Sequence, residues 1–392
     1  MKDTCLCPLC VGNETEIIFK KSLKFLNISF ENKLCLTCGF FFRFPILTTN
    51  ELISLYKDKN AMLSSTSYVN QDNKDSRDNQ IRRETIDFLN KNVPLDKRDV
   101  LDIGCNDGFF LSGLDSRYWN LFGIDCGANS ENIENKNITL FNIPIENFNT
   151  SKKFYLITLL NTLEHISNPC LVIKKIYSIL DDDGYLLIDV PNSLKPAVKI
   201  SEFYSFEHVS NFTEATLRFL LISEGFEIIA TELKNSSIKV ICRKKVHFSK
   251  ENINHEILNS NAKSLENVIN SYNLQKKTFE LNIINVINNI DFEQYYGKIG
   301  VFGAGWHTLQ LYDLVNFNDH VKCFFDSDPK KQGTYFLNKL VMSPNKIPET
   351  NVEIVIISSG DYQREMYNSI KLYKDSVKII KLYPEDEYCS IQ

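Results

Sequence analysis

Three features that would assign this 392-residue chain to other protein classes are missing from its sequence. No run of about 18 or more apolar residues is present, so we expect no membrane-spanning helix. No basic excess is present either: the formal net charge is −5, which argues against a nucleic-acid partner. Residues 1–5 show no apolar signal core, so we expect a cytoplasmic protein rather than an exported one.

A disulfide framework is also unexpected, although the chain has 11 cysteines. Most of them stand alone in the sequence, and scattered single cysteines are typical of a protein in the reducing cytoplasm. Apolar residues make up 43% of the sequence, which is enough for a buried core in each domain. The length predicts roughly two to three domains.

Four cysteines are not scattered, because they form two Cys-x-x-Cys pairs: Cys7 with Cys10, and Cys35 with Cys38. A two-residue spacer lets both thiolates of a pair reach one tetrahedral ion, and two pairs complete four-sulfur coordination. The alternating apolar residues of 16–30 predict a hairpin between the pairs. We predict a zinc ribbon over residues 1–48.

This zinc ion would be structural, because four-sulfur coordination leaves no open position for catalysis. Free thiols in a small core and a redox-active pair are the alternatives. Cys5 is an additional thiol that could replace Cys7 as a ligand.

Residues 100–108, with the sequence Val-Leu-Asp-Ile-Gly-Cys-Asn-Asp-Gly, are the most informative stretch. A short apolar run ends in Asp102 and enters a turn that contains Gly104, Asn106 and Gly108. Open α/β sheets bind nucleotide-like ligands where a strand delivers its carboxyl end to such a turn. The glycines let the backbone approach a ligand, and a helix expected beyond Gly108 would direct its amide groups at that ligand.

A second acid, Asp125, ends the next expected strand, over 121–125. A carboxylate at this place can accept hydrogen bonds from both ribose hydroxyls. The turn at 100–108 resembles the first motif of S-adenosylmethionine enzymes. A dehydrogenase would more often have Gly-x-Gly-x-x-Gly here, and that motif is absent from the turn. A purely structural glycine turn is the alternative.

Residues 79–246 alternate between strand-like and helix-like segments, which predicts a mostly parallel, doubly wound sheet. The last two strands, 227–233 and 238–243, are expected to form an antiparallel edge. The expected earlier strands are 100–103, 121–125, 138–142, 154–160 and 184–190, and the expected helices are 81–89, 171–180 and 213–224.

The order of these elements resembles class I S-adenosylmethionine-dependent methyltransferases across the whole span. The resemblance implies that the turn residues surround the methionine end of the cofactor, that Asp125 binds the ribose, and that Ile145 lies near the adenine. It also implies that Asn161 and Leu163 cover the far side. The implied cofactor-binding residues are therefore Asp102, Gly104, Asn106, Gly108, Asp125, Ile145, Asn161 and Leu163. Glu164 and His165, which follow, are expected to fix a strand-to-helix corner or to touch substrate, with catalysis as the alternative.

A Glu-His pair, Glu207 and His208, follows the fifth expected strand, at the rim where the methyl donor should open. The histidine supplies a base with a pKa near neutral, and the carboxylate can orient the imidazole or the acceptor. The alternative is that the pair only caps the next helix and orders the rim.

The zinc ribbon, the methyltransferase core, the Glu-His-x-Ser element and a second Rossmann-like domain together resemble the sugar C-methyltransferases. This family methylates a nucleotide-activated keto-sugar at the carbon beside its carbonyl, and its rim motif reads Tyr-His-Glu-His-x-Ser-Tyr-Phe. The resemblance implies that His208, Glu207 and Tyr204 are catalytic. This chain departs from the motif at Ser205, Phe206 and Asn211, and Tyr204 stands one position early, so methylation of a hydroxyl stays open.

Three further segments complete the expected organisation. Residues 49–78 would connect the ribbon to the core, either as a flap over the acceptor or as an inert loop. Residues 247–292 are expected to form a helical connector, with two helices separated near Asn273. Residues 293–392 read as a smaller Rossmann-like domain.

The last domain contains Gly303-x-Gly305 and the strand-end acid Asp326, but Thr308 stands at the third glycine position, so a dinucleotide site is a weak match. Its counterpart in the family is thought to hold the nucleotide-sugar. The family's Asp-x-Asn/Asp-Pro-x-Lys-x-Gly stretch is matched by Asp326, Asp328, Pro329, Lys331 and Gly333. A scaffolding role is the alternative.

The sequence therefore predicts an α/β protein with an N-terminal zinc ribbon, a Rossmann-like class I methyltransferase core and a second, smaller Rossmann-like domain. Its predicted activity is S-adenosylmethionine-dependent methyl transfer to a nucleotide-activated sugar, with structural zinc and His208 as the base. An NAD-linked oxidoreductase and a non-catalytic binding protein with a methyltransferase-like core are the alternatives. The sequence does not predict the oligomeric state.

Overall fold

The computed structural model forms two compact units, the first with most of the described residues up to Ser271 and the second with those from Tyr272 onward. The structure describes residues 5–23, 28–51, 54, 77–96, 98–127, 135, 137–196, 203–204, 208–234, 236–245, 255–315, 317–360 and 362–383. The expected flap, for most of its length, and Glu207 lie outside the described residues.

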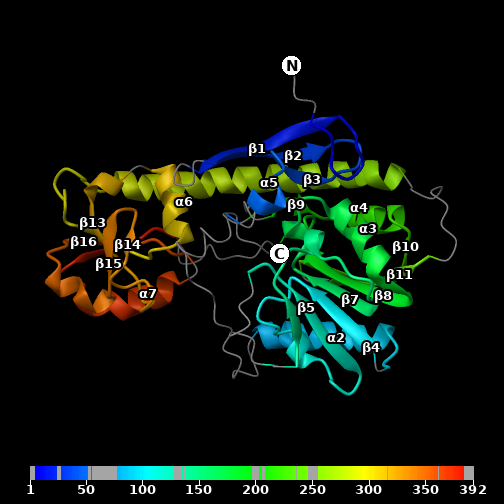
Figure 1. The fold of residues 1–392 in the computed structure, drawn as a ribbon. Coiled ribbons are helices and arrows are strands. Elements are labelled where there is room, and N and C mark those ends of the chain that lie inside the picture. The colour runs from blue at the N-terminus through cyan, green and yellow to red at the C-terminus, as the bar shows by residue number, and fades with distance from the viewer. Residues whose placement is uncertain are drawn as a thin grey trace. The chain divides into compact units, whose positions relative to one another are not determined.

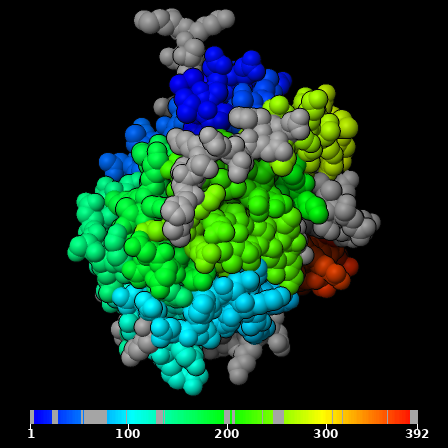
Figure 2. Space-filling view, turned by 90° about the vertical axis from the view of Figure 1, so that its right-hand side faces the viewer, coloured from blue at the N-terminus to red at the C-terminus, as the bar shows by residue number. Residues whose placement is uncertain are grey.

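The N-terminal segment forms a four-stranded sheet with the order β1-β2-β3-β9. Its strands are β1 (Thr15–Leu23), β2 (Ile28–Cys35), β3 (Phe41–Phe44) and β9 (Ser210–Asn211). The hairpin expected between the cysteine pairs is present as β1 and β2. Strand β9 was not expected: it comes from the rim segment, pairs antiparallel with β3, and so joins the ribbon to the core (Figure 1). Figure 2 shows the N-terminal segment, in blue, against the green part of the core.

The methyltransferase-like span forms a seven-stranded sheet with the order β10-β11-β8-β7-β4-β5-β6. The five strands from β8 to β6 are parallel, and β11 and β10 form the expected antiparallel edge. Strand β7 is buried at every residue but its last, as expected for a strand covered on both faces. The strands are β4 (Arg98–Ile103), β5 (Trp119–Ile124), β6 (Thr139–Phe141), β7 (Phe154–Leu160), β8 (Leu180–Pro191), β10 (Phe226–Lys234) and β11 (Ser237–Lys244).

Three α-helices accompany this sheet: α2 (Arg77–Asn92), α3 (Pro169–Ile179) and α4 (Glu214–Ser223). Helix α3 begins where the Asn168 side chain accepts the Leu171 N–H and Pro169 occupies the first turn. Helix α4 begins with reciprocal hydrogen bonds between Thr213 and Thr216. The helix expected directly beyond Gly108 is absent from residues 98–127, where only the 3-10 helix η2 (Leu111–Gly113) forms.

The second unit contains a six-stranded sheet with the order β14-β15-β13-β12-β16-β17, parallel except for β14. Strands β12 and β16 at its centre are fully buried. The strands are β12 (Ile299–Phe302), β13 (Val321–Phe325), β14 (Tyr335–Phe336), β15 (Lys339–Met342), β16 (Ile354–Ile357) and β17 (Lys378–Lys381). Helices α6 (Trp306–Leu314) and α7 (Gln363–Ile370) belong to the same unit.

One continuous helix, α5 (His255–Asn288), replaces the two connector helices that the sequence predicted. The expected break near Asn273 was wrong, because asparagine has only moderately poor helix propensity and buried helix residues lie on both sides of it, at Tyr272 and at Ile283. At its N-terminal end the helix backbone approaches the ribbon so closely that a side chain at Gly39 would collide with Asn261 and Ala262. None of the helices in the described ranges is long and apolar enough to span a membrane.

Candidate functional site

The four cysteines of the ribbon converge in space as their spacing predicted. The Sγ atoms of Cys7 and Cys38 are 3.7 Å apart, and those of Cys10 and Cys35 are 3.6 Å apart. All four sulfur atoms lie within 4.8 Å of one another, and Cys5 is not part of the group. In a tetrahedral zinc site with bonds of about 2.3 Å, sulfur atoms are about 3.8 Å apart. The sulfur positions therefore fit a zinc ion.

Backbone amides support the same reading. The Leu9 N–H points at Cys7 Sγ and the Gly12 N–H at Cys10 Sγ, each at 3.4 Å. Such N–H groups stabilise thiolates, which are the zinc-binding form of cysteine. The cysteine group is compatible with a structural zinc ribbon.

The turn after β4 has the geometry that its glycines predicted. Gly104 and Gly108 have φ of +79° and +77°, and Asn106 shares this left-handed region at +47°. A Cβ atom at Gly104 would lie 2.2 Å from Thr162 Oγ1, so only glycine fits there. The loop after β7 therefore packs directly against the turn.

Asp102 is buried at the end of β4, and its Oδ1 accepts a 2.6 Å hydrogen bond from Thr158 Oγ1 of β7. Burial raises the pKa of Asp102 to about 7, and the hydrogen bond from Thr158 opposes this shift only partly. A buried carboxylate without a cation is costly, so this position favours a ligand that brings a positive charge.

Asp125 follows the adjacent strand β5, half-buried. Its Oδ2 accepts the Asn106 N–H at 2.9 Å, and its Oδ1 accepts the Gly127 N–H at 2.7 Å. Two acids therefore end neighbouring parallel strands around one glycine turn. This is the arrangement expected for a nucleoside whose ribose and cationic tail bind at the carboxyl ends of the strands.

The remaining expected cofactor residues surround the same edge of the sheet. Ile145 is buried in η3 (Ile145–Asn147), which follows β6. Asn161 is exposed directly after β7 with φ of +48°, and its N–H donates to Asp189 O of β8. Leu163 begins η4 (Leu163–His165) and is fully buried, so it contributes to the wall rather than to an open face.

The structure describes two of the three expected catalytic rim residues, Tyr204 and His208. Tyr204 is buried, with its ring stacked on Phe19 of the ribbon at 4.1 Å between centroids. It also contacts Phe41 of β3 edge-on at 6.1 Å. Its ring therefore belongs to the ribbon packing. His208 is half-buried and directly precedes the segment that forms β9.

A combination that the sequence did not predict forms where β9 packs against η4. The rings of His165 and His208 are 5.0 Å apart between centroids, edge to face. Glu164 lies beside them, with its Oε1 3.9 Å from His165 Nε2. Burial of the Glu164 carboxyl group raises its pKa to about 8. Each residue was noted from the sequence, but the sequence did not predict that β9 contacts η4 and so brings His208 to His165.

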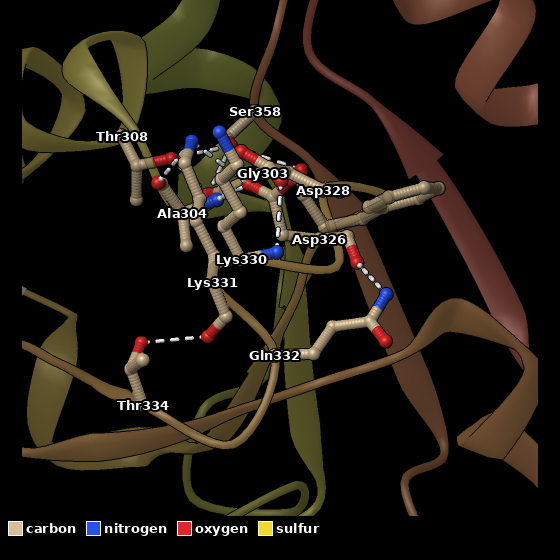
Figure 3. A network of polar contacts seen from close by, with 11 residues as sticks. Gly303, Ala304, Thr308, Asp326, Asp328, Lys330, Lys331, Gln332, Thr334 and Ser358 are labelled. Atoms are coloured by element: carbon tan, nitrogen blue, oxygen red, sulfur yellow. Dashed lines mark hydrogen bonds and ion pairs between the residues drawn. The ribbon is translucent and has the colours of Figure 1, made fainter. Parts of the chain in front are cut away.

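The corresponding edge of the second unit is occupied by its own side chains (Figure 3). Asp326 Oδ2, after β13, accepts the Ala304 N–H at 2.9 Å and lies 3.3 Å from Lys331 Nζ. Lys331 Nζ also donates to Ala304 O, and the Asp328 N–H donates to Asp326 Oδ1. Both oxygens of this strand-end acid are therefore engaged in contacts inside the protein. The stretch from Asp326 to Gly333, which matches the family's motif, therefore stabilises its own loop.

Two family models match parts of this chain. Residues 77–231 match the family model described as "Methyltransferase domain", and residues 295–380 match one described as "C2185-like, N-terminal". A ubiquinone biosynthesis O-methyltransferase of Glaesserella parasuis serovar 5 is 31% identical over 108 residues, which are 24% of this chain and 46% of the relative. The chain thus spans about half the length of this curated relative.

Two solved structures are similar to part of the chain. An S-adenosylmethionine-dependent methyltransferase from Clostridium acetobutylicum has 17% identity and a TM-score of 0.36, covering 50% of this chain and 98% of that one. The 1,6-didemethyltoxoflavin-N1-methyltransferase of Burkholderia thailandensis has 15% identity and a TM-score of 0.40, covering 51% and 92%. The family model shows that residues 77–231 are similar to methyltransferase domains.

Proposed function

We propose that this chain transfers the methyl group of S-adenosylmethionine to a nucleotide-activated sugar. The observation that carries the cofactor assignment is the pair of acids, Asp102 and Asp125, at the ends of adjacent parallel strands around a glycine turn. Asp102 would pair with the ammonium group of the methionine end, and Asp125 would bind the ribose hydroxyls.

Methyl transfer from a sulfonium requires little covalent help from the protein. The methyl carbon is already electrophilic, so the site must hold the acceptor atom opposite the sulfur that departs. It must also remove one proton from the acceptor. His208, half-buried at the rim, is the proposed base. If the acceptor is a carbon beside a carbonyl, donors must also hold the enolate oxygen; if it is a hydroxyl, the base alone suffices.

The acceptor class rests on the combination of parts rather than on any single contact. A cysteine ribbon at 1–48, a methyltransferase core at 79–246 and a Rossmann-like unit at 293–392 occur together in the sugar C-methyltransferases that this chain resembles. Residues 49–78 and 247–292 would connect these domains. The six-stranded sheet of the last unit supports a second Rossmann-like domain.

The NAD-linked alternative finds less support in the second unit. A dinucleotide would require Asp326 to accept ribose hydroxyls, yet its Oδ2 lies 3.3 Å from Lys331 Nζ. A ribose would have to displace this lysine and break an ion pair whose side chains are only 12% and 14% exposed.

Calorimetric titration of the full chain with S-adenosylmethionine, S-adenosylhomocysteine and NAD⁺ tests the cofactor assignment. We expect binding of the first two and none of NAD⁺. Tight NAD⁺ binding would favour the oxidoreductase, and binding of none of the three would favour a non-catalytic protein. Incubation with S-adenosylmethionine and a panel of nucleotide-sugars, followed by mass spectrometry, tests the acceptor.

A further inference from the structure

We propose that Glu164, His165 and His208 bind a divalent transition-metal ion, separate from the zinc of the cysteine ribbon. One ligand atom from each of the three side chains lies within 4.8 Å of the others. Ligands about 2.1 Å from a shared ion in tetrahedral geometry are about 3.4 Å apart, and Glu164 Oε1 is already 3.9 Å from His165 Nε2.

The burial of Glu164 and the missing hydrogen-bond partner of its Oε2, within the part of the chain that the structure describes, are the independent observation that points to a ligand. The residue is 2% exposed, and its Oε2 has no hydrogen-bond donor among the described residues. A buried carboxyl oxygen without a partner costs free energy, and a bound cation would satisfy it.

The chemistry of the three groups selects the kind of ion. Two imidazoles and one carboxylate form the ligand set that proteins use for zinc, iron and manganese, and three protein ligands leave positions open for water or substrate. The cysteine group differs in both respects, because it has only sulfur ligands and four of them. A single equivalent of zinc should therefore fill the four thiolates and leave the second site open, so the two sites can be studied separately.

The position of the cluster suggests its use, which rests on the proposed methyl transfer. Glu164 and His165 follow the strand β7 whose loop contacts the glycine turn, and His208 lies at the rim. An ion here would polarise an acceptor oxygen and lower the pKa of the acceptor proton. In the ion-bound protein His208 is a ligand, so its role as a base applies only to the ion-free site.

Manganese is the best probe, because Mn²⁺ prefers nitrogen and oxygen ligands and competes poorly for four thiolates. The zinc-loaded full chain is titrated with Mn²⁺, and loss of the free-ion electron paramagnetic resonance signal measures binding. We expect one saturable site. Loss of even an outer partner of a metal ligand costs about 10- to 100-fold in affinity, so Glu164→Gln should weaken binding at least about tenfold.

Glu227→Gln is the matched control, because Glu227 is exposed on β10 and pairs with Arg243 of β11. It should bind Mn²⁺ as the unmodified chain does. Thermal unfolding and S-adenosylmethionine binding report whether each variant is folded. If Glu164→Gln does not fold, His208→Asn at the half-buried rim provides the same comparison.

Equal Mn²⁺ affinity in Glu164→Gln and the unmodified chain would overturn the metal site, as would the absence of saturable binding. Methyl transfer that survives complete chelation while no Mn²⁺ binds would reject the ion and leave the proposed function intact. Saturable Mn²⁺ binding without any methyl transfer would reject the function and leave the ion.

Discussion

At the scale of single residues, two threonines of the β7 segment contact the glycine turn and the acid before it. Thr162 closes over Gly104, and Thr158 holds Asp102. The sequence predicted Asp102 and Asp125 as cofactor ligands, because each ends an apolar run at the carboxyl end of an expected strand. It did not reveal that Tyr204 packs on Phe19, since that contact joins segments far apart in the chain.

Replacing Asp125 by alanine should weaken S-adenosylmethionine binding by at least about tenfold, because each hydrogen bond to a charged acceptor contributes roughly 1.5–3 kcal/mol. Calorimetry measures the change. Asp99→Ala is the matched control, because Asp99 lies near the opposite end of β4, where it pairs with Lys152. Unchanged affinity in Asp125→Ala would reject the ribose assignment.

Cofactor binding should depend on pH through Asp102. Burial raises the pKa of Asp102 to about 7, so below this pH the empty site holds a neutral acid. A cationic ammonium binds the ionised form, so affinity should fall as the pH drops below about 7, and binding at lower pH should release a proton. Calorimetry at pH 6 in buffers of different ionisation enthalpy detects that proton. Proton release unchanged in Asp102→Asn would assign it to another group.

The raised pKa of Asp102 also makes the free energy of unfolding depend on pH, but this quantity falls as the pH rises, whereas cofactor affinity falls as the pH drops. Because the folded pKa of Asp102 is raised, its contribution to the free energy of unfolding is fully present below about pH 4 and is lost as the pH rises to about 7. The empty protein with Asp102→Asn should therefore lose less stability across this interval than the unmodified protein. Urea unfolding at several pH values measures the difference, and parallel curves for the two proteins would contradict it.

His208→Ala should leave S-adenosylmethionine affinity nearly unchanged and reduce methyl transfer by about 10²- to 10⁴-fold, the usual contribution of a general base. Single-turnover kinetics with saturating cofactor measure the loss. Full activity in this variant would show that the proton is removed elsewhere.

At the scale of elements, strand β9 is the feature with the largest consequence. It spans only two residues, yet it pairs with β3 of the ribbon and packs against η4. The parallel strands were predictable because each is a bounded apolar run. A two-residue strand has no such pattern, and its pairing is decided by tertiary packing. The continuity of α5 was missed for a related reason, since burial outweighed the weak propensity of Asn273.

Because β3 connects the cysteine group to β9, loss of the ribbon zinc should disturb the rim as well as the fold. Cys10→Ser should remove zinc and lower the melting temperature, and it should broaden the NMR signal of the His208 imidazole. Cys126→Ser is the control, since Cys126 is exposed and outside the group. A metal-free protein with unchanged melting temperature would contradict a structural role for the ion.

At the scale of the whole molecule, the sequence predicted two open α/β sheets and a zinc ribbon; the structure has two such sheets, and its four clustered cysteines are compatible with a zinc ribbon. The sequence could not predict which rim residues meet. Glu164 and His165 were expected to fix a corner or touch substrate and His208 to lie at the rim, and the structure places one ligand atom of each within 4.8 Å of the others. Residues brought together by a pairing between distant segments leave no periodic signal in the chain.

The most direct test of the account is transfer of a deuterium-labelled methyl group from S-adenosylmethionine by the purified full chain to nucleotide-activated keto-sugars and hydroxy-sugars. The account predicts that one sugar class gains the labelled methyl group with matching release of S-adenosylhomocysteine, and that Asp125→Ala lowers this rate at limiting cofactor. A protein that binds S-adenosylmethionine yet methylates no nucleotide-sugar, while methylating an acceptor of another class, would contradict it.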